Sequence, residues 1–415
     1  MSNANMNSEG LLQAISQWNN HLDFEPTSHR YVFYLDTSFF GKVPMIVTLP
    51  DNYDKQFEYP LLVMLHGAVQ LSSFDRAEET IQDTNDGISA NGDVFSSYFA
   101  KQNYVILTPI ADPGKRFNWV KNSFSDGSGV PMTNPTFAVI VDGILQLKQA
   151  VNIDDSRVYA LGHSDGADGC FALSILAPSV FAGFVLYNSM LTNLQANDIY
   201  LKNLVNRPLY IVHSELDALR PIMQVRAVIK ALQEVSKSIL FKEYPAMVHY
   251  DKHLELDLPR ANLFLRKTIR NPFPSDIYLE SNSESYSRCD WLKVTGFDLL
   301  KDKAAWHNEV NAPIVDRNGT YVEKASYYSN GESYSIRGTY RDNAFYIESS
   351  RVLAFNIYLS PSMVDMSKRI RCVVNGVEKF NRKVRPNKNF MIDTFMKDFD
   401  RKALWVNVIR ISLSD

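Results

Sequence analysis

The stretch that decides the fold is residues 157–176, RVYALGHSDGADGCFALSIL. An apolar run that ends at Leu161 leads into Gly-x-Ser-x-Gly at residues 162–166, and small and apolar residues at helical spacing follow. A strand, a sharp turn and a helix in this order form a nucleophile elbow, whose cramped turn requires glycine two residues before and after the serine. The pattern predicts Ser164 as a nucleophile, and its alternative is a tight turn whose serine only caps the helix.

A catalytic serine needs a histidine that accepts its proton and an acid that orients this histidine. With an elbow of this kind the chain order is serine, acid, histidine, and the acid follows a later strand. Residues 209–212 form an apolar strand pattern, and Asp217 follows it, four residues before Pro221, which can open the next helix. We predict Asp217 as the acid; Glu215 is the alternative acid, and Asp217 could also be a simple helix-entry residue.

The base is expected after the next strand pattern, at residues 239–244. The loop that follows holds His249 and His253. His249 comes five residues after Tyr244, a reach that suits a loop folding back over the sheet edge, whereas His253 is expected to begin or flank a helix. We therefore predict His249 as the base.

The oxyanion of a tetrahedral intermediate needs two preorganised N–H donors. One comes from the residue after the nucleophile, Asp165, and the other from the loop after an early strand. That loop is His66-Gly67-Ala68, so the second donor is predicted to be the amide of Ala68 or of Val69.

Strand and helix patterns alternate from residue 30 to about residue 270, after an opening hairpin at 30–49 that turns near Gly41. This alternation predicts a mostly parallel sheet with helices on both faces. The expected strands are 61–65, 104–109, the elbow strand, 181–187, 209–212 and 239–244, and the expected helices are 93–101, 135–150, the elbow helix, 221–236 and 258–269.

The pattern changes after Arg270. Two prolines at 272 and 274 cannot continue a helix, and residues 271–276 are predicted as a linker. Beyond it, alternating apolar residues and three Asn-Gly pairs, at 318–319, 330–331 and 375–376, favour short strands joined by tight hairpins. We expect an N-terminal extension (1–29), an α/β domain (30–270) and a smaller β-rich domain (277–415), which we expect to be a sandwich.

Composition excludes several classes. The 415-residue chain has a formal net charge of −3, which gives no general attraction to nucleic acid, and no apolar run approaches the length that spans a bilayer. Three cysteines at wide spacing argue against a disulfide framework and indicate buried thiols. The motifs HExxH, Walker A and GxGxxG are absent, so no metal or nucleotide cofactor is expected.

The polar start of the chain has no signal-peptide pattern. The expected location is the cytoplasm if this start is native and outside the cell if a leader has been removed. The oligomeric state is left open.

Residues 30 to about 270 resemble the α/β-hydrolase superfamily, and within it the esterases related to polyhydroxybutyrate depolymerases and feruloyl esterases. The resemblance rests on LLVMLHGA (61–68), DDSRVYALGHSDGA (154–167), YIVHSELDALRP (210–221) and the histidine loop 245–253. Relatives often have glycine where this chain has Ser214 and Ala246, and a triple glycine in the early loop. The segment from 271 and Trp291 resemble, more weakly, the β domain that follows the hydrolase in bacterial members.

The long irregular segment 111–133 is expected beside the active-site face, as a lid or binding loop. Phe117 and Trp119 are predicted to line the substrate pocket together with His163, which flanks Ser164; the alternative for the two aromatic residues is that they anchor the segment to the core. His66 and His163 also suit a loop-shaping role.

The expected activity is hydrolysis of a carboxylic ester, either a small molecule or one linked to a polymer. The alternatives are a serine peptidase of the prolyl-oligopeptidase type, which usually carries an extra domain ahead of the hydrolase, and a non-catalytic binding protein with the hydrolase fold.

Overall fold

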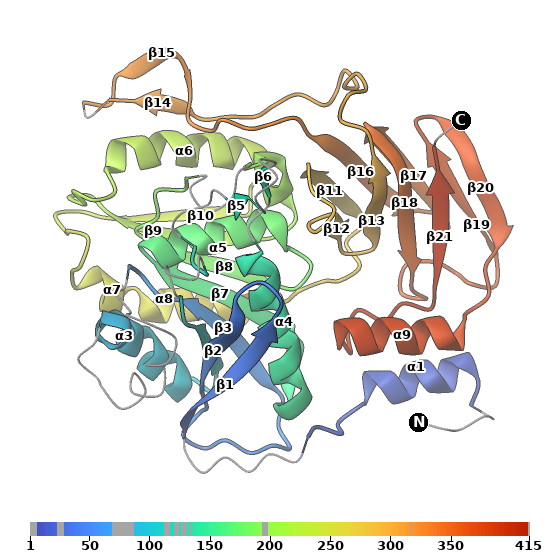
Figure 1. The fold of residues 1–415 in the computed structure, drawn as a ribbon, viewed down its shortest axis with the longest axis horizontal. Coiled ribbons are helices and arrows are strands. Elements are labelled where there is room, and N and C mark those ends of the chain that lie inside the picture. The colour runs from blue at the N-terminus through green and yellow to red at the C-terminus, as the bar shows by residue number, and fades with distance from the viewer. Residues whose placement is uncertain are drawn as a thin grey trace. The chain divides into compact units, whose positions relative to one another are not determined.

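The computed structural model describes residues 6–22, 29–68, 87–111, 117–119, 124–125, 131–132, 135–192, 198–316 and 318–413. The chain forms two compact units (Figure 1). We call residues 21–270 and 310–330 the α/β unit, and residues 1–20, 271–309 and 331–415 the β unit.

The α/β unit is built on an eight-stranded sheet in the order β1-β2-β4-β3-β7-β8-β9-β10. The hairpin of β1 and β2 is antiparallel and β2 also pairs antiparallel with β4, whereas the pairs from β4 to β10 are parallel. The central strands are buried because both faces are covered, and this explains their continuous apolar sequences. The bounds are β1 (Arg30–Thr37), β2 (Gly41–Thr48), β3 (Tyr59–Leu65), β4 (Val105–Pro109), β7 (Ile153–His163), β8 (Gly183–Tyr187), β9 (Leu209–Ser214) and β10 (Ile239–Tyr244).

Helices connect these strands, as the alternating pattern predicts. On one face, side chains of α3 and α8 share a hydrophobic cluster with alternate residues of the central strands, such as Leu62 and Met64. Residues of opposite parity, such as Leu65, reach α5 on the other face. The helices are α3 (Gly87–Lys101), α4 (Thr136–Ala150), α5 (Asp165–Leu176), α6 (Ile222–Val235), α7 (His253–Leu256), α8 (Leu258–Lys267) and the 3₁₀ helix η3 (Leu201–Val205), and two short strands, β5 (Phe124–Ser125) and β6 (Pro131–Met132), pair before α4.

A segment far along the chain completes the α/β unit. Residues 310–330, here called the arm, form the two-stranded ribbon of β14 (Pro313–Val315) and β15 (Tyr321–Ser326). Sequence alone places these residues in the C-terminal domain. The structure groups them with the α/β unit because their polar side chains and backbone bond to it, as described below.

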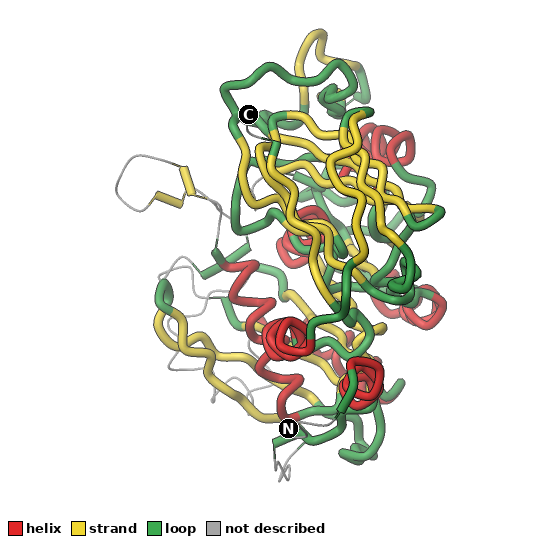
Figure 2. The backbone as a smooth tube through the Cα atoms, turned by 90° about the vertical axis from the view of Figure 1, so that its right-hand side faces the viewer, coloured by secondary structure: helices red, strands yellow, loops and turns green. Residues whose placement is uncertain are grey.

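The β unit contains two sheets, with strand orders β11-β16-β17-β19-β20 and β12-β13-β18-β21 (Figures 1 and 2). Buried side chains from both sheets form one hydrophobic cluster, as in a sandwich. The first sheet is mixed, because β17 and β19 are parallel. The strands are β11 (Asp276–Ser281), β12 (Arg288–Cys289), β13 (Leu292–Phe297), β16 (Tyr334–Arg341), β17 (Ala344–Ser350), β18 (Val352–Leu359), β19 (Arg369–Val374), β20 (Val377–Lys383) and β21 (Asn407–Ser412).

Two helices in the β unit were not anticipated from the sequence. The helix α1 (Ser8–Ser16) lies in the predicted N-terminal extension, and α9 (Lys388–Asp398) interrupts the C-terminal strands. They pack against each other and against the core of the unit (Figure 1). An asparagine caps each helix: Asn7 accepts a hydrogen bond from Gly10 N and Asn387 accepts one from Phe390 N.

Two of the three predicted Asn-Gly turns are confirmed. Asn318-Gly319 joins β14 to β15, and Asn375-Gly376 joins β19 to β20 with positive φ at both residues. The prediction for Asn330-Gly331 is wrong, because the Asn330 amide binds the backbone of Ile199 instead of closing a hairpin.

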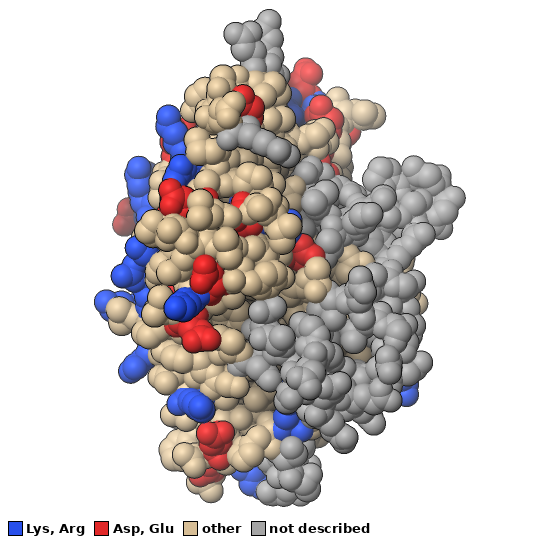
Figure 3. All heavy atoms as spheres, turned by 90° about the vertical axis from the view of Figure 1, so that its left-hand side faces the viewer, with Lys and Arg blue, Asp and Glu red and all other residues tan. Residues whose placement is uncertain are grey.

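No helix among the described residues is long and apolar enough to cross a membrane. All three cysteines are buried, as predicted. On the face of the molecule in Figure 3, acidic and basic side chains both occur on the described surface.

Candidate active site

The predicted strand, turn and helix are present at Ser164. The strand β7 ends at His163, α5 begins at Asp165, and Ser164 between them has φ 56° and ψ −122°, a conformation that non-glycine residues rarely adopt. A methyl group on Gly162 would lie 2.2 Å from the carbonyl carbon of Gly166. One on Gly166 would lie 1.9 Å from the carbonyl oxygen of Leu65, so both positions require glycine.

The three residues predicted as nucleophile, base and acid lie together. Ser164 Oγ is 2.9 Å from His249 Nε2, and His249 Nδ1 is 2.6 Å from Asp217 Oδ2. Because an ionised carboxylate only accepts hydrogen bonds, His249 donates from Nδ1 and its Nε2 can accept the proton of Ser164. All three residues are buried, and they come from the end of β7 and the loops after β9 and β10.

Four hydrogen bonds hold the Asp217 carboxylate. Its Oδ1 accepts the backbone N–H groups of Leu219 (2.9 Å) and Arg220 (2.8 Å), and its Oδ2 accepts from Asn188 Nδ2 (2.8 Å) and His249. Burial raises the pKa of this carboxyl, but the hydrogen bonds from His249, Asn188 and Arg220 outweigh burial and lower the pKa to about 2. Asp217 is therefore ionised near neutral pH and can stabilise a protonated His249.

Asn188 is a site residue that the sequence analysis missed. It follows β8 directly, is fully buried and has φ 53°. Its Nδ2 also donates to Ser214 Oγ (2.6 Å), and its Oδ1 accepts from His253 Nε2 (2.7 Å). The available signal was its position, because polar residues at the carboxyl end of a buried parallel strand lie at the same sheet edge as Asp217.

The two alternative residues have other partners. His253 begins α7, as expected, and bonds to Asn188. Glu215 accepts the backbone N–H of Ala246 at 2.9 Å, on the loop that carries His249. The hydrogen-bond partners thus favour Asp217 over Glu215 as the acid and His249 over His253 as the base.

The two predicted oxyanion donors flank Ser164. The N–H of Asp165, the first residue of α5, has no acceptor within its own helix. A methyl group on Gly67 would lie 3.7 Å from Ser164 Cβ, so the loop that leads to the exposed Ala68 passes beside the nucleophile. Val69 lies outside the described residues, and the donor role of both amides stays a prediction.

Sheet, elbow and chain order together decide the fold. The sheet is mostly parallel, Ser164 stands on the turn between a central strand and its helix, and serine, acid and histidine follow in this order in loops after β7, β9 and β10. The unit has the α/β-hydrolase fold. The last segment of this unit, the arm, comes from beyond residue 309, after a stretch of the β unit.

No protein-family model and no curated protein sequence matches the chain. Solved structures similar to it include a thermostable esterase, with 18% identity, a TM-score of 0.45, and coverage of 58% of this chain and 64% of that one. An S-formylglutathione hydrolase from Agrobacterium tumefaciens has 10% identity and a TM-score of 0.45 over 60% of this chain and 100% of that one.

Dipeptidyl peptidase 4 from Porphyromonas gingivalis has 13% identity and a TM-score of 0.42, over 58% of this chain and 35% of that one. The chain thus spans less than two thirds of the thermostable esterase and about a third of the peptidase. The fold assignment rests on the sheet topology and the elbow.

Phe117 and Trp119, predicted to line the substrate pocket, are both fully buried. Phe117 packs edge-on against Phe40, and Trp119 packs against His66 and donates from Nε1 to its carbonyl oxygen at 2.8 Å. These contacts fit the alternative, in which the aromatic residues anchor segment 111–133 and shape the loop before Ala68. The rest of that segment lies mostly outside the described residues.

His163 is also buried, with its ring centroid 4.8 Å from that of His249 and its Nε2 3.2 Å from the His249 carbonyl oxygen. Burial lowers the pKa of His163 to about 3, so the ring is neutral. Its contact with the His249 backbone agrees with a loop-shaping role, and an exposed fraction of 4% leaves little of its surface open to substrate.

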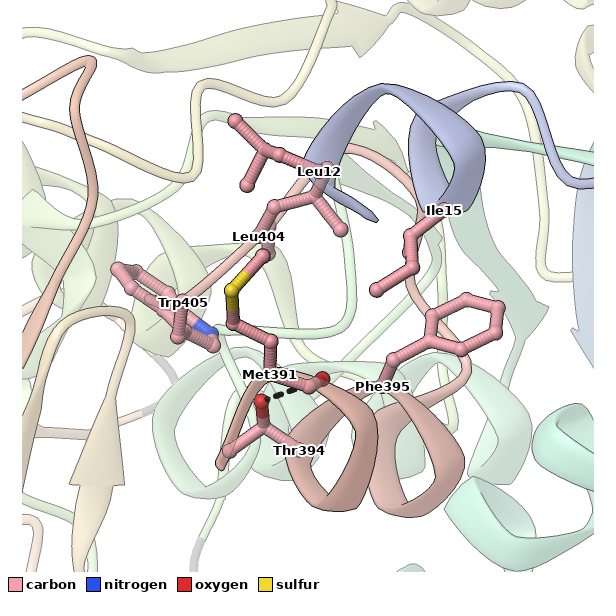
Figure 4. Close-up of a pocket in the computed structure, with 8 residues that line it drawn as sticks. Leu12, Ile15, Met391, Thr394, Phe395, Leu404 and Trp405 are labelled. Atoms are coloured by element: carbon pink, nitrogen blue, oxygen red, sulfur yellow. Dashed lines mark hydrogen bonds between the residues drawn. The ribbon is translucent and has the colours of Figure 1, made fainter. Parts of the chain in front are cut away.

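No group of His, Cys, Asp or Glu side chains within the described ranges could hold a metal ion. An apolar hollow in the β unit lies between α1 and α9 (Figure 4). Its lone hydroxyl, on Thr394, donates to the backbone of its own helix. The hollow therefore offers no chemistry comparable to that around Ser164; it is lined by Leu12, Ile15, Met391, Thr394, Phe395, Ala403, Leu404 and Trp405.

Proposed function

We propose that this chain is a serine hydrolase that cleaves carboxylic esters through Ser164, His249 and Asp217. One observation carries the proposal: the continuous hydrogen-bonded line from Ser164 Oγ through His249 to Asp217, with distances of 2.9 and 2.6 Å. A serine held in this way can lose its proton to His249 as its oxygen attacks.

The reaction would run in two halves. Ser164 Oγ bonds to the ester carbonyl carbon while its proton moves to His249 Nε2, and the amides of Asp165 and Ala68 bind the resulting oxyanion. The carbon–oxygen bond to the alcohol then breaks, and the alcohol leaves with the proton from His249. Water attacks the acyl-enzyme in the same manner, with His249 as base, and releases the carboxylic acid and Ser164.

The proposed substrates are carboxylic esters. The sequence resembles esterases of the polyhydroxybutyrate depolymerase and feruloyl esterase group, and two of the similar structures carry the names esterase and S-formylglutathione hydrolase. A suitable panel combines short p-nitrophenyl esters, a feruloyl methyl ester, hydroxybutyrate oligomers and peptide amides.

The test pairs active-site labelling with turnover. A fluorophosphonate probe should label the wild type and not Ser164→Ala, whose kcat on esters should fall by about 10⁴ or more. Ser174→Ala is the matched control, because this serine also lies on α5 and donates to the backbone carbonyl of Phe171 at 2.7 Å. A wild type that neither labels nor turns over any ester would refute the proposal, and preference for amides would assign the chain to the peptidases.

A further inference from the structure

The loop that follows β8, residues 188–192, holds an unfavourable backbone conformation beside the acid. Asn188 and Leu191 have φ of 53° and 55°, in the left-handed region that residues with a side chain seldom adopt. Such a conformation persists only where its surroundings fix it. Because Asn188 donates to Asp217, the loop conformation bears directly on the candidate active site.

Asp168, on α5, accepts hydrogen bonds from the N–H and O–H groups of this loop. Its Oδ1 accepts from Met190 N (2.8 Å), Leu191 N (3.1 Å) and Ser189 Oγ (2.5 Å). Its Oδ2 lies 3.2 Å from Arg220 Nη2, the side chain of the residue whose N–H bonds to Asp217. Arg220 also bonds to Asp165, so two carboxylates of α5 join this helix to the acid loop, and Asp168 alone of the two also binds loop 188–192.

The arm donates hydrogen bonds to the backbone carbonyl groups of the same loop. Tyr327 donates its hydroxyl to Met190 O (2.9 Å), and Tyr328 donates to Leu191 O (2.5 Å). Burial raises the pKa of both phenols well above the ordinary value, so both remain donors across the working pH range. The N–H and C=O groups of residues 190 and 191 are therefore bound from two sides.

Side-chain amides fasten the arm at both ends. Gln224 on α6 donates to Pro313 O and accepts from Val315 N, each at 2.9 Å. Asn330 accepts from Ile199 N and donates to Ile199 O, each at 2.8 Å. These bonds fix where the two tyrosines stand.

We propose that Tyr327 and Tyr328 of the arm are positioning residues for the candidate active site. They act through loop 188–192, keeping Asn188 bonded to Asp217 and Asp217 bonded to His249. The inference rests on the proposed function, since it gives the arm a role in that same site. A purely structural role for the tyrosines is the competing explanation, and it predicts lost stability without a specific loss in kcat.

The test uses the full chain with Tyr327→Phe/Tyr328→Phe, which removes only two hydroxyl groups. We expect kcat on a p-nitrophenyl ester to fall about 10- to 100-fold with KM changed less than about threefold, because acid orientation acts on the chemical step. Tyr321→Phe, an exposed tyrosine of the same arm, should behave as wild type. Val228→Ala, in the core of α6, should lower stability while kcat at a temperature well below unfolding is retained.

Combined variants test whether the two tyrosines act on Asp217 through Asn188. Adding the two phenylalanines to Asn188→Ala should lower kcat by no more than about twofold further, because the path is already broken. Multiplied losses, an unchanged kcat in the double variant, or an equal loss in Val228→Ala would overturn the proposal. Should the double variant not fold, Tyr327→Phe, whose side chain is only partly buried, replaces it.

A spectroscopic measurement separates this inference from the proposed function. The 2.6 Å bond between His249 Nδ1 and Asp217 should give a far-downfield proton resonance, absent in His249→Gln. The resonance should shift or broaden in the tyrosine double variant and not in Tyr321→Phe. This measurement needs no substrate. If the wild type is inactive, the proposed esterase function is refuted, and the resonance still tests whether the tyrosines position Asp217 and His249.

Discussion

Glu215 Oε2 accepts a 2.9 Å hydrogen bond from the backbone N–H of Ala246, and this bond ties the acid loop to the histidine loop. The two carboxylates of the segment HSELD thus have different tasks. Asp217 faces the His249 ring, and Glu215 faces the backbone of the loop that carries it.

The two carboxylates should respond differently to removal of charge. Asp217→Asn should lower kcat by about 10⁴, because an amide cannot hold His249 in the required tautomer and does not stabilise the imidazolium. Glu215→Gln retains an acceptor for the Ala246 N–H and should stay within about tenfold of wild type. Equal losses in steady-state kinetics would show that the acid has been misassigned.

Ala246 has φ 56°, where glycine is favoured, at the position where the resembled esterases often carry glycine. Ala246→Gly should therefore raise the free energy of unfolding by up to about 1 kcal/mol, measured by urea denaturation. Ala227→Gly, the same substitution inside α6, should lower it by about 1 kcal/mol. A loss of stability at both positions would contradict the backbone strain inferred at Ala246.

The elbow glycines should not tolerate alanine. In Gly166→Ala the new methyl would meet backbone atoms, which cannot rotate away, and we expect insoluble or inactive protein. Gly376→Ala provides a contrast: its φ is +82° but no atom lies within 4 Å, so the cost should be only about 1–2 kcal/mol. Soluble yield, probe labelling and thermal unfolding compare the two, and a fully active Gly166→Ala would refute the close approach.

Burial lowers the pKa of His253 to about 4. The unfolded chain binds this proton near pH 6.5 and the folded chain does not, so the stabilising contribution is full above about pH 6.5 and is lost as the pH falls toward 4. His253→Gln keeps a donor at the position of Nε2 for Asn188 and should flatten the decline in unfolding free energy by about 1.4 kcal/mol per pH unit between about pH 6 and 5.

Asp168 should change the free energy of unfolding with pH in the opposite direction and serves as a control. Burial raises its pKa to about 6 against the effect of Arg220 and Ser189, so this group favours the folded state as the pH falls through 6. Asp168→Asn removes that gain and should steepen the decline that His253→Gln flattens. Urea unfolding at several pH values measures both slopes, and parallel slopes in wild type and both variants would contradict these pKa shifts.

Much of the α/β unit could be predicted because its signals are local. The requirement for glycine at 162 and 166, the continuous apolar strands, and the loops that carry Asp217 and His249 follow from the geometry of one turn and one sheet edge. The chain order of the hydrogen-bonded residues needs no knowledge of tertiary contacts.

The missed features depend on contacts between distant residues. Nothing local to Asn188 shows that its amide meets Asp217, and nothing local to Asn330 shows that it binds Ile199 and not its own hairpin. The irregular segment 111–133 allows Phe117 and Trp119 either to line a pocket or to anchor the segment, and their burial depends on contacts with Phe40 and His66 that lie far away in sequence. The helix α9 has weak periodicity, because Phe390, Met391 and Ile392 are consecutive and Met396 is exposed.

The return of residues 310–330 to the α/β unit means that the chain passes between the two units four times, after residues 20, 270, 309 and 330. Cutting the gene at the proline linker would therefore yield a fragment of the α/β unit that lacks its last ribbon, β14 and β15. The two units therefore cannot be exchanged independently by recombination. An event that replaced the C-terminal half of the gene would also replace the tyrosines that contact loop 188–192. In this protein the boundary of the α/β unit is set by which residues share a core, and the chain crosses it more than once.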